Sequence, residues 1–155
     1  MRLTLLACLG LAACSGSNSG VDAAEVVDCS TITGVDTFVV PLKKAGANGA
    51  IYFQMMSADP APPARNDNTW VVQINAMQAG VVGSPVDGAS LVVTPFMPAH
   101  QHGSPKMVVV TPAGQPGWYT LSPVFLWMPG VWETTISVTS GQTTDSAVYK
   151  FCIPS

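Results

Sequence analysis

Thr69-Trp-Val-Val-Gln-Ile-Asn-Ala-Met77 is the segment that decides the fold prediction, because apolar residues recur at every second position in most of it. Such alternation is the pattern of a β-strand with one face on a core and the other towards solvent. The segment therefore predicts a half-buried strand. We expect Trp70, Val72, Ile74 and Ala76 on the buried face, and Gln73 and Asn75 on the outer face.

β-rich runs separated by turn residues lie on both sides of this strand, and no stretch shows sustained helical periodicity. The stretch Asn66-Asp67-Asn68 is predicted to be a loop, since it follows the proline-rich sequence of residues 59–63. About eight short strands with regular turns indicate an all-β, immunoglobulin-like β-sandwich. Besides residues 69–77, the expected strands are 37–42, 50–57, 89–96, 106–111, 118–126, 131–139 and 147–153.

The composition limits what this chain does. Its 155 residues suffice for one domain with a real core. Only 10% are charged, whereas about 25% is typical. One of the six basic residues, Arg2, falls in the signal-like segment described next, and the other five face nine acidic residues, a net charge of -4. A chain without a basic stripe lacks the electrostatic footprint of a nucleic-acid-binding protein.

The N-terminus has the features of a bacterial lipoprotein signal. Met1-Arg2 precedes a short apolar run, residues 3–13, which is too brief to span a bilayer as a helix. Leu11-Ala-Ala-Cys14 then resembles the lipobox, in which the cysteine is lipidated and becomes the first mature residue. The alternative is an ordinary secretory signal with an incidental cysteine. We therefore expect a signal peptide over residues 1–13 and lipidation at Cys14.

A lipid anchor would place the protein in the cell envelope, attached to a membrane. Ser15 follows the cysteine where an aspartate would act as a retention signal, so the resemblance implies an outer membrane facing the periplasm if the organism is Gram-negative. The small polar residues after Ser15 are typical of a flexible tether. We expect the tether to cover residues 14–28 and the folded domain to cover residues 29–155.

The four cysteines can be assigned by subtraction. Cys8 lies in the signal segment and Cys14 takes the lipid, which leaves Cys29 and Cys152 at the two ends of the domain. An oxidising compartment favours a disulfide between them. Closing so long a loop stabilises a fold by about 4–5 kcal/mol in the chain-entropy model. A cysteine metal site is the rival interpretation, and the absence of a CxxC spacing disfavours it.

Both histidines lie in Met97-Pro-Ala-His100-Gln-His102-Gly103, and Met128 lies in a parallel phrase that also continues with Met-Pro. Imidazole binds copper and zinc, and thioether sulfur favours Cu(I). On an extended segment His100 and His102 point to the same side, because they are two residues apart. The pattern predicts a copper site of His100, His102, Met97 and Met128, provided that both Met-Pro phrases end strands on one rim. The alternative is that these residues only shape a loop and fill the core.

Three phrases, taken in order, carry a resemblance to a known family. Gly88 to Gly103 contains the Met-Pro and His-x-His pieces, Gly117-Trp-Tyr119 follows, and Phe125-Leu-Trp-Met-Pro-Gly-Val-Trp-Glu133 closes the set. Together they resemble the YtkA-like domain, which is related to the FixH family, over about residues 70–138. The resemblance implies an immunoglobulin-like sandwich outside the cytoplasm, with some relatives near copper-handling or oxidase-assembly systems. The lipoprotein start replaces the membrane helix expected of FixH proteins.

Two functions from different classes follow from these residues. The first is a lipid-anchored, non-enzymatic domain that binds copper or passes it to a copper-handling or other envelope partner. The second is an envelope protein-interaction module that displays the same loops without a metal. An enzyme is not expected, because neither Gly-x-Ser-x-Gly nor His-Glu-x-x-His occurs. Of the four tryptophans, Trp127 is the one expected to be exposed, since it adjoins the Met-Pro-Gly turn.

Overall fold

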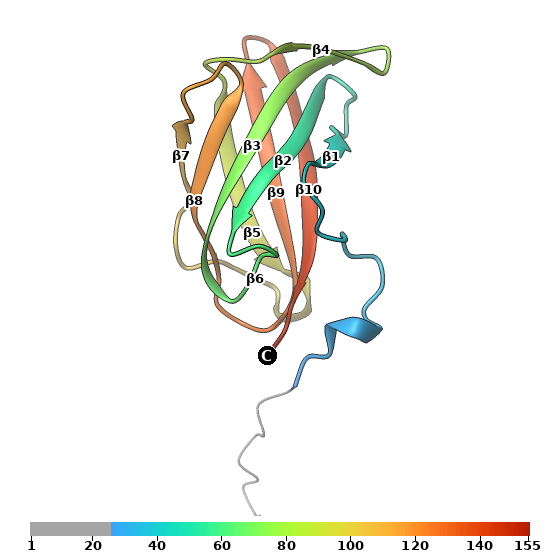
Figure 1. Cartoon of the computed structure of the whole chain (residues 1–155), viewed down its shortest axis with the longest axis vertical. Helices are drawn as coiled ribbons and strands as arrows, with labels where there is room; N and C mark the ends of the chain where they lie inside the picture. The colour runs from blue at the N-terminus through green and yellow to red at the C-terminus, as the bar shows by residue number, and fades with distance from the viewer. Residues whose placement is uncertain (1–25) are drawn as a thin grey trace, which may run out of the picture.

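The computed structural model describes residues 26–155, which form two antiparallel β-sheets packed face to face (Figure 1). This arrangement confirms the predicted fold class, an all-β sandwich of immunoglobulin-like type. The predicted signal peptide, the lipidation site Cys14 and most of the predicted tether lie outside the described residues. Within residues 26–155, no helix is long and apolar enough to cross a membrane.

The described part of the chain contains ten strands and two short 3-10 helices. The first sheet has the order β1 (Leu42–Ala45), β2 (Ile51–Asp59), β3 (Asn66–Gln78), β8 (Trp118–Leu126) and β7 (Val109–Pro112), and β4 (Val81–Pro85) also pairs with β3. The second sheet has the order β10 (Thr143–Ile153), β9 (Gly130–Ser140), β5 (Ser90–Met97) and β6 (His102–Gly103). The helices are η1 (Cys29–Thr31) and η2 (Pro98–His100).

The core lies between the two sheets and is built by alternate residues of the long central strands. Trp70 of β3 is fully buried and makes edge-to-face contacts with Tyr149 and Phe151 of β10, at ring-centroid distances of 6.4 and 5.7 Å. Alternate residues of β9, Trp132, Ile136 and Val138, are also buried. These large side chains hold the two sheets together by the burial of apolar surface.

Four strand predictions need correction. The strand expected at 37–42 does not form: β1 begins only at Leu42, because Pro41 lacks a ladder donor and Asp36 exchanges hydrogen bonds with Lys150 of β10 instead. The stretch 66–68 is not a loop but the start of β3, paired with residues 124–126 of β8. β10 begins at Thr143, before the expected start at residue 147, and β7 begins at residue 109, after the expected 106.

The alternation of the central strand also fails at one end. Trp70, Val72 and Ile74 are buried as expected, but Ala76 is exposed and Asn75 is buried. A register shift in the pairing of β3 with β4 falls at this point. The Asn75 amide is satisfied there because it donates to the Gly83 carbonyl and accepts from the Gln54 amide. The local kink therefore exchanges which side chains face inward.

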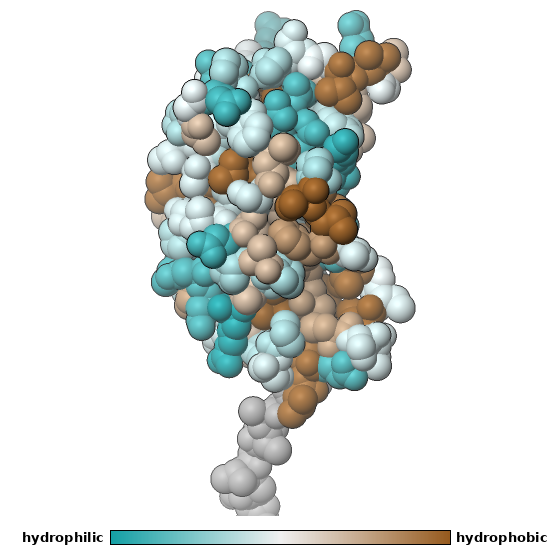
Figure 2. Space-filling model, in the orientation of Figure 1, coloured by the Kyte–Doolittle hydropathy of each residue, from teal (hydrophilic) through white to brown (hydrophobic). Residues whose placement is uncertain are grey.

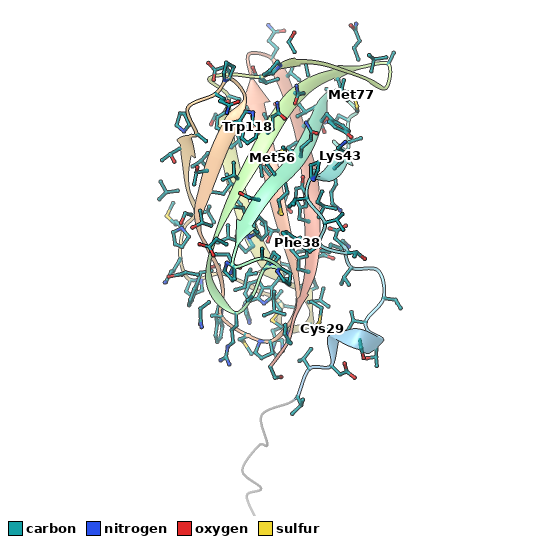
Figure 3. All side chains as sticks on the ribbon, in the orientation of Figure 1. Cys29, Phe38, Lys43, Met56, Met77 and Trp118 are labelled. Atoms are coloured by element: carbon teal, nitrogen blue, oxygen red, sulfur yellow. A yellow bond between two sulfur atoms is a disulfide. The ribbon has the colours of Figure 1, made fainter. Side chains whose placement is uncertain are left out.

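The predicted disulfide between Cys29 and Cys152 is present, with a Cα–Cα distance of 5.6 Å. It joins the segment that precedes β1 to the end of β10. Figure 1 shows this N-terminal segment leaving the sandwich at the same end as the C-terminus, and Figure 3 places Cys29 at that end and Met77 at the opposite one. The disulfide therefore fixes the N-terminal segment to one end of the sandwich.

Candidate functional site

Both Met-Pro phrases lie at strand ends on the same rim of the sandwich. Met97 is the last residue of β5, and Met128 lies in the connection between β8 and β9. Proline lacks the N–H that a central ladder needs, so each phrase stops its strand where the sequence predicts. The indole N–H of Trp132 donates to the Met128 carbonyl at 2.9 Å, which holds the backbone of the second phrase in place.

A cavity of about 480 Å³ opens on this rim, and Met97, His100 and Met128 all line it. The chain thus brings together three of the four residues that the sequence predicts as ligands. Met97 lies at the floor with 1% of its surface exposed, Met128 is half-buried, and His100 is exposed at the edge. The cavity combines a deep thioether with an imidazole that solvent reaches.

Gly130, the first residue of β9, makes room for the deepest ligand candidate. Its φ of +125° is one that side-chain-bearing residues rarely adopt, and a Cβ placed on it would overlap the Met97 methyl group. Two local features therefore favour glycine at position 130: the backbone conformation and the close approach of the Met97 side chain. Any other residue at this position would displace the thioether from the cavity floor.

His102 lies on β6, the edge strand that pairs with β5 in the second sheet. In the ladder between β5 and β6, His102 is directly opposite Met97, so the two side chains lie on the same face of the sheet, with Cβ atoms about 5 Å apart. The imidazole stacks on Trp127 at a centroid distance of 5.1 Å and meets the edge of Trp132 at 5.9 Å. His102 does not itself line the cavity but lies next to it, half-buried between two indoles.

The expectation that both histidines lie on one extended segment is wrong. His100 ends the helix η2, and Gln101 follows in the left-handed conformation at φ +53° before β6 begins. Pro98 at the start of η2 favours this turn because its ring fixes a helical φ. The turn nevertheless brings the rings of His100 and His102 to a centroid distance of 5.7 Å.

That separation suits two imidazoles that share one metal ion. A bond of about 2.0–2.1 Å to a ring nitrogen puts the metal roughly 3 Å from the ring centroid, so two such rings have centroids roughly 5–6 Å apart. The 5.7 Å between His100 and His102 falls in this range. The spacing of the two rings is therefore compatible with a shared ion.

The two nitrogens of His102 differ in their surroundings. Nδ1 is 3.1 Å from the Gly103 carbonyl oxygen, which only accepts hydrogen bonds, so Nδ1 carries the proton in this contact. In the neutral ring the free lone pair is then on Nε2, which is buried without a hydrogen-bond partner. Among the described residues, only one other buried side-chain nitrogen or oxygen lacks a hydrogen-bond partner, the Trp70 indole nitrogen. That nitrogen is a donor and binds no metal.

The donors at this rim are neutral. Within residues 26–155, no group of three or more histidines, cysteines or acidic residues gathers to hold a metal, so a site here depends on the thioethers. Arg65 also lines the cavity, and its Nε–H donates to the Trp127 carbonyl at 3.0 Å. A cation beside a neutral donor set disfavours a divalent ion more strongly than a monovalent one.

The sequence did not indicate two further walls of the cavity, Val27 and Ile32. Both belong to the segment around the disulfide, which was expected to be tether and domain start. No periodicity marks them, and only the folded chain shows that Cys29 carries this segment to the rim. Trp127, by contrast, is exposed as predicted, with 37% of its surface accessible.

Residues 47–137 match the model of the YtkA-like family, and they make up more than half of the chain. The chain therefore belongs to the YtkA-like family, which indicates an extracytoplasmic domain. Comparisons with curated proteins and with solved structures found no match. The family match includes Met97, His100, His102 and Met128 but neither cysteine of the disulfide.

Proposed function

We propose that this domain binds a copper ion at the rim, through Met97, His100, His102 and Met128, and passes it to a partner in the cell envelope. The observation that carries the proposal is the buried, unpartnered Nε2 of His102. Leaving a buried polar atom without a partner costs free energy, about 1–3 kcal/mol. A metal ion would satisfy this atom, while the Nδ1 contact to Gly103 holds the ring in the required tautomer.

The chemistry of the donors favours Cu(I) over Cu(II) and Zn(II). Two thioethers and two imidazoles form a soft, neutral set, whereas zinc sites commonly include thiolate or carboxylate ligands. The Arg65 side chain at the cavity adds positive charge, which repels a divalent ion twice as strongly as a monovalent one. We expect Met97 to bind from the floor and His102 from beside the cavity, and His100 and Met128 to close the site at its mouth.

The proposed setting is the outside of a membrane, with the mature chain anchored through Cys14. The lipobox-like sequence before Cys14 and the disulfide of the folded domain both fit an extracytoplasmic lipoprotein. In this setting the domain acts without catalysis, as a carrier that receives and releases the ion. The partner would be a copper-handling protein of the same envelope.

A second candidate function is a protein-interaction module without metal. Its support is Trp127, an exposed indole beside an apolar-walled cavity, since tryptophans of this kind often anchor protein interfaces. We rank this function second because of Nε2 of His102. A protein partner bound at the rim would leave that nitrogen without a hydrogen bond unless the partner inserted a donor. Metal titration separates the two functions.

The test is titration of the soluble domain with Cu(I), Cu(II) and Zn(II), each in competition with a chelator of known affinity. We expect one Cu(I) per chain, held much more tightly than either divalent ion. Met128→Leu should weaken Cu(I) binding, whereas Met107→Leu should not, because Met107 is 89% exposed and away from the cavity. Sulfur scattering in the X-ray absorption spectrum would identify the thioether ligands. Equal affinities for the Met107 and Met128 variants, or no Cu(I) uptake, would reject the copper proposal.

The anchor has its own test. Cys14→Ser should abolish acylation, so the precursor should stay unprocessed or the protein should move from the detergent phase to the aqueous phase. Cys8→Ser, within the same signal segment, is the matched control and should be processed normally. A Cys14→Ser protein that partitions into detergent like the parent would show that the lipobox assignment is wrong.

A further inference from the structure

The segment of residues 26–34, here called the arm, forms one wall of the cavity on the rim. Val27 and Ile32 line the cavity together with Met97 and Met128. The arm lies outside the residues that match the YtkA-like family, so it is a feature of this chain beyond the matched region. Brown, hydrophobic side chains adjoin the grey segment in Figure 2, at the end of the molecule where the arm lies.

Little besides the disulfide holds the arm in place. Its helix η1 contains no buried residue, and Val26 is 81% exposed. The backbone N–H groups of Thr31 and Ile32 bond to carbonyls within the arm itself. The Val27 N–H donates to the Ser155 hydroxyl at 2.8 Å, at an exposed position. Among the described residues, Asp36 is the first that exchanges hydrogen bonds with the backbone of β10.

We infer that the arm is a disulfide-held cover, which retains the metal ion while Cys29 and Cys152 are joined and opens when they are reduced. The inference rests on the proposed copper site and adds a control of release to it. With the covalent link gone, a segment with few buried contacts opens at low cost in free energy. The cavity then loses its Val27 and Ile32 wall, and solvent and an acceptor protein reach Met97 and Met128.

The reductant would be a dithiol protein of the envelope. Its thiolate attacks one sulfur of the Cys29–Cys152 bond, and a mixed disulfide forms while the other cysteine leaves as a thiolate and takes up a proton. The second thiol of the reductant then resolves the mixed disulfide, so the dithiol is oxidised to a disulfide and two cysteine thiols are produced. The copper ion keeps its oxidation state throughout.

Methionine oxidation tests the cover without any metal. The metal-free domain is exposed to dilute hydrogen peroxide, and each methionine sulfoxide is counted by mass spectrometry in the wild type and in Cys29→Ser/Cys152→Ser. Met107, 89% exposed, reports the oxidant, and Met55, fully buried in β2, reports global unfolding. We expect the oxidation rate of Met97 relative to Met55 to rise several-fold in the double variant. An unchanged ratio would overturn the inference, whether or not the variant is less stable overall.

A second variant keeps the disulfide and replaces only one apolar side chain that the arm contributes to the cavity wall. Ile32→Ser should raise the oxidation rate of Met128 relative to Met55, whereas Thr33→Ser, its exposed neighbour outside the cavity, should not. An Ile32→Ser protein that oxidises like the wild type would show that the arm shields nothing.

The rate of Cu(I) release to a chelator then tests whether the cover controls how long the metal is retained. With ascorbate as reductant, which avoids thiols, the cysteine double variant should release Cu(I) several-fold faster than the wild type. Serine replaces cysteine so that no new thiolate ligand is created. If the wild type binds no Cu(I), the copper proposal fails while the oxidation ratios still decide whether the arm is a cover. If Cu(I) binds but leaves both proteins at one rate, the cover does not control release.

Discussion

A buried polar side chain lies near each end of β9, and the two differ in how far their hydrogen-bonding atoms are satisfied. Beyond its C-terminal end, where the chain turns into β10, the Asp145 carboxylate is 1% exposed and accepts four backbone N–H bonds of 2.8–3.0 Å. At its N-terminal end, near Gly130, the imidazole of His102 is enclosed by two indoles and its Nε2 has no partner. Figure 1 shows these ends at opposite poles of the sandwich.

The difference separates a buried polar group that is fully hydrogen-bonded from one that is not. Burial of a charge is tolerated only when hydrogen bonds replace the lost water, and the Asp145 cradle supplies them. Its donors belong to Asn48, Ala50, Ile51 and Ser146, so the carboxylate ties the connection between β1 and β2 to β10. The free nitrogen of His102 stabilises nothing in the metal-free fold. We therefore expect changes at the Asp145 end to act on stability and changes at the other end to act on binding.

Removal of the Asp145 carboxylate should have the largest effect. Asp145→Ala leaves four backbone donors unpaired, and we expect the free energy of unfolding to fall by at least about 3 kcal/mol. Asp67→Ala is the matched control, because Asp67 only forms an exposed ion pair with Lys106, worth about 0–1 kcal/mol. Denaturant unfolding of both variants measures the difference. Equal losses would show that the cradle has no special role.

The same carboxylate should make the fold sensitive to acid. Burial raises the pKa of the Asp145 carboxyl, but the hydrogen bonds from Asn48, Ala50, Ser146 and Ile51 outweigh it, so its pKa lies below the usual 3.8. The folded state thus binds the proton less readily than the unfolded chain. The contribution of Asp145 is then present above pH 3.8 and is lost as the pH falls through the lowered pKa. Unfolding measured from pH 6 to pH 2 should show this loss, and Asp145→Asn should lack it.

Substitution of Gly130 should cost more than substitution of Gly141 at the other end of β9. Both have a positive φ, but a Cβ on Gly130 meets the Met97 methyl group, whereas one on Gly141 meets nothing within 4 Å. We expect Gly141→Ala to lose about 1 kcal/mol from the backbone alone. Gly130→Ala should lose about 2–3 kcal/mol, because its φ of +125° is less accessible to alanine than the +58° of Gly141 and the Met97 methyl group must also move. Thermal unfolding ranks the two, and Gly130→Ala alone should also weaken Cu(I) binding. Similar losses with unchanged binding in both would contradict the packing described for Met97.

Replacement of His102 by an apolar ring should have the smallest effect on stability. His102→Phe removes an unpaired buried nitrogen and keeps an aromatic ring against Trp127, so the free energy of unfolding should stay within about 1 kcal/mol of the wild type or rise. Chemical unfolding of the metal-free proteins measures it. A loss of the size expected for Asp145→Ala would mean that the imidazole is a structural group like the carboxylate.

The sequence predicts the central strands well because their side-chain alternation is a direct consequence of burial on one face. β8 forms over the residues expected, and Trp70, Val72 and Ile74 of β3 are buried as expected. The edges are harder to predict. β4 and β6 are short and were not expected, because their pairing depends on neighbouring strands rather than on their own residues. The segment at 37–42 is β-rich, yet the hydrogen bonds of Asp36 to β10 determine its path.

In the candidate site, too, the sequence predicts what local pattern determines and fails where contacts between distant segments decide. Residue types and the Met-Pro strand ends predict that Met97, His100 and Met128 gather at one rim, and they do. The sequence does not reveal that His102 is enclosed by Trp127 and Trp132, since that depends on how β6 folds back on β5. The arm was missed for the same reason, because a contact between the two ends of the domain leaves no local pattern.

Competition for Cu(I) between a chromogenic chelator and the metal-free domain, wild type against His102→Phe, tests the central claim most directly. We expect the wild type to take one Cu(I) per chain, and His102→Phe, equally folded, to bind it about 100-fold more weakly. A wild type that leaves all Cu(I) on the chelator, or a His102→Phe protein that binds as tightly as the wild type, would contradict it.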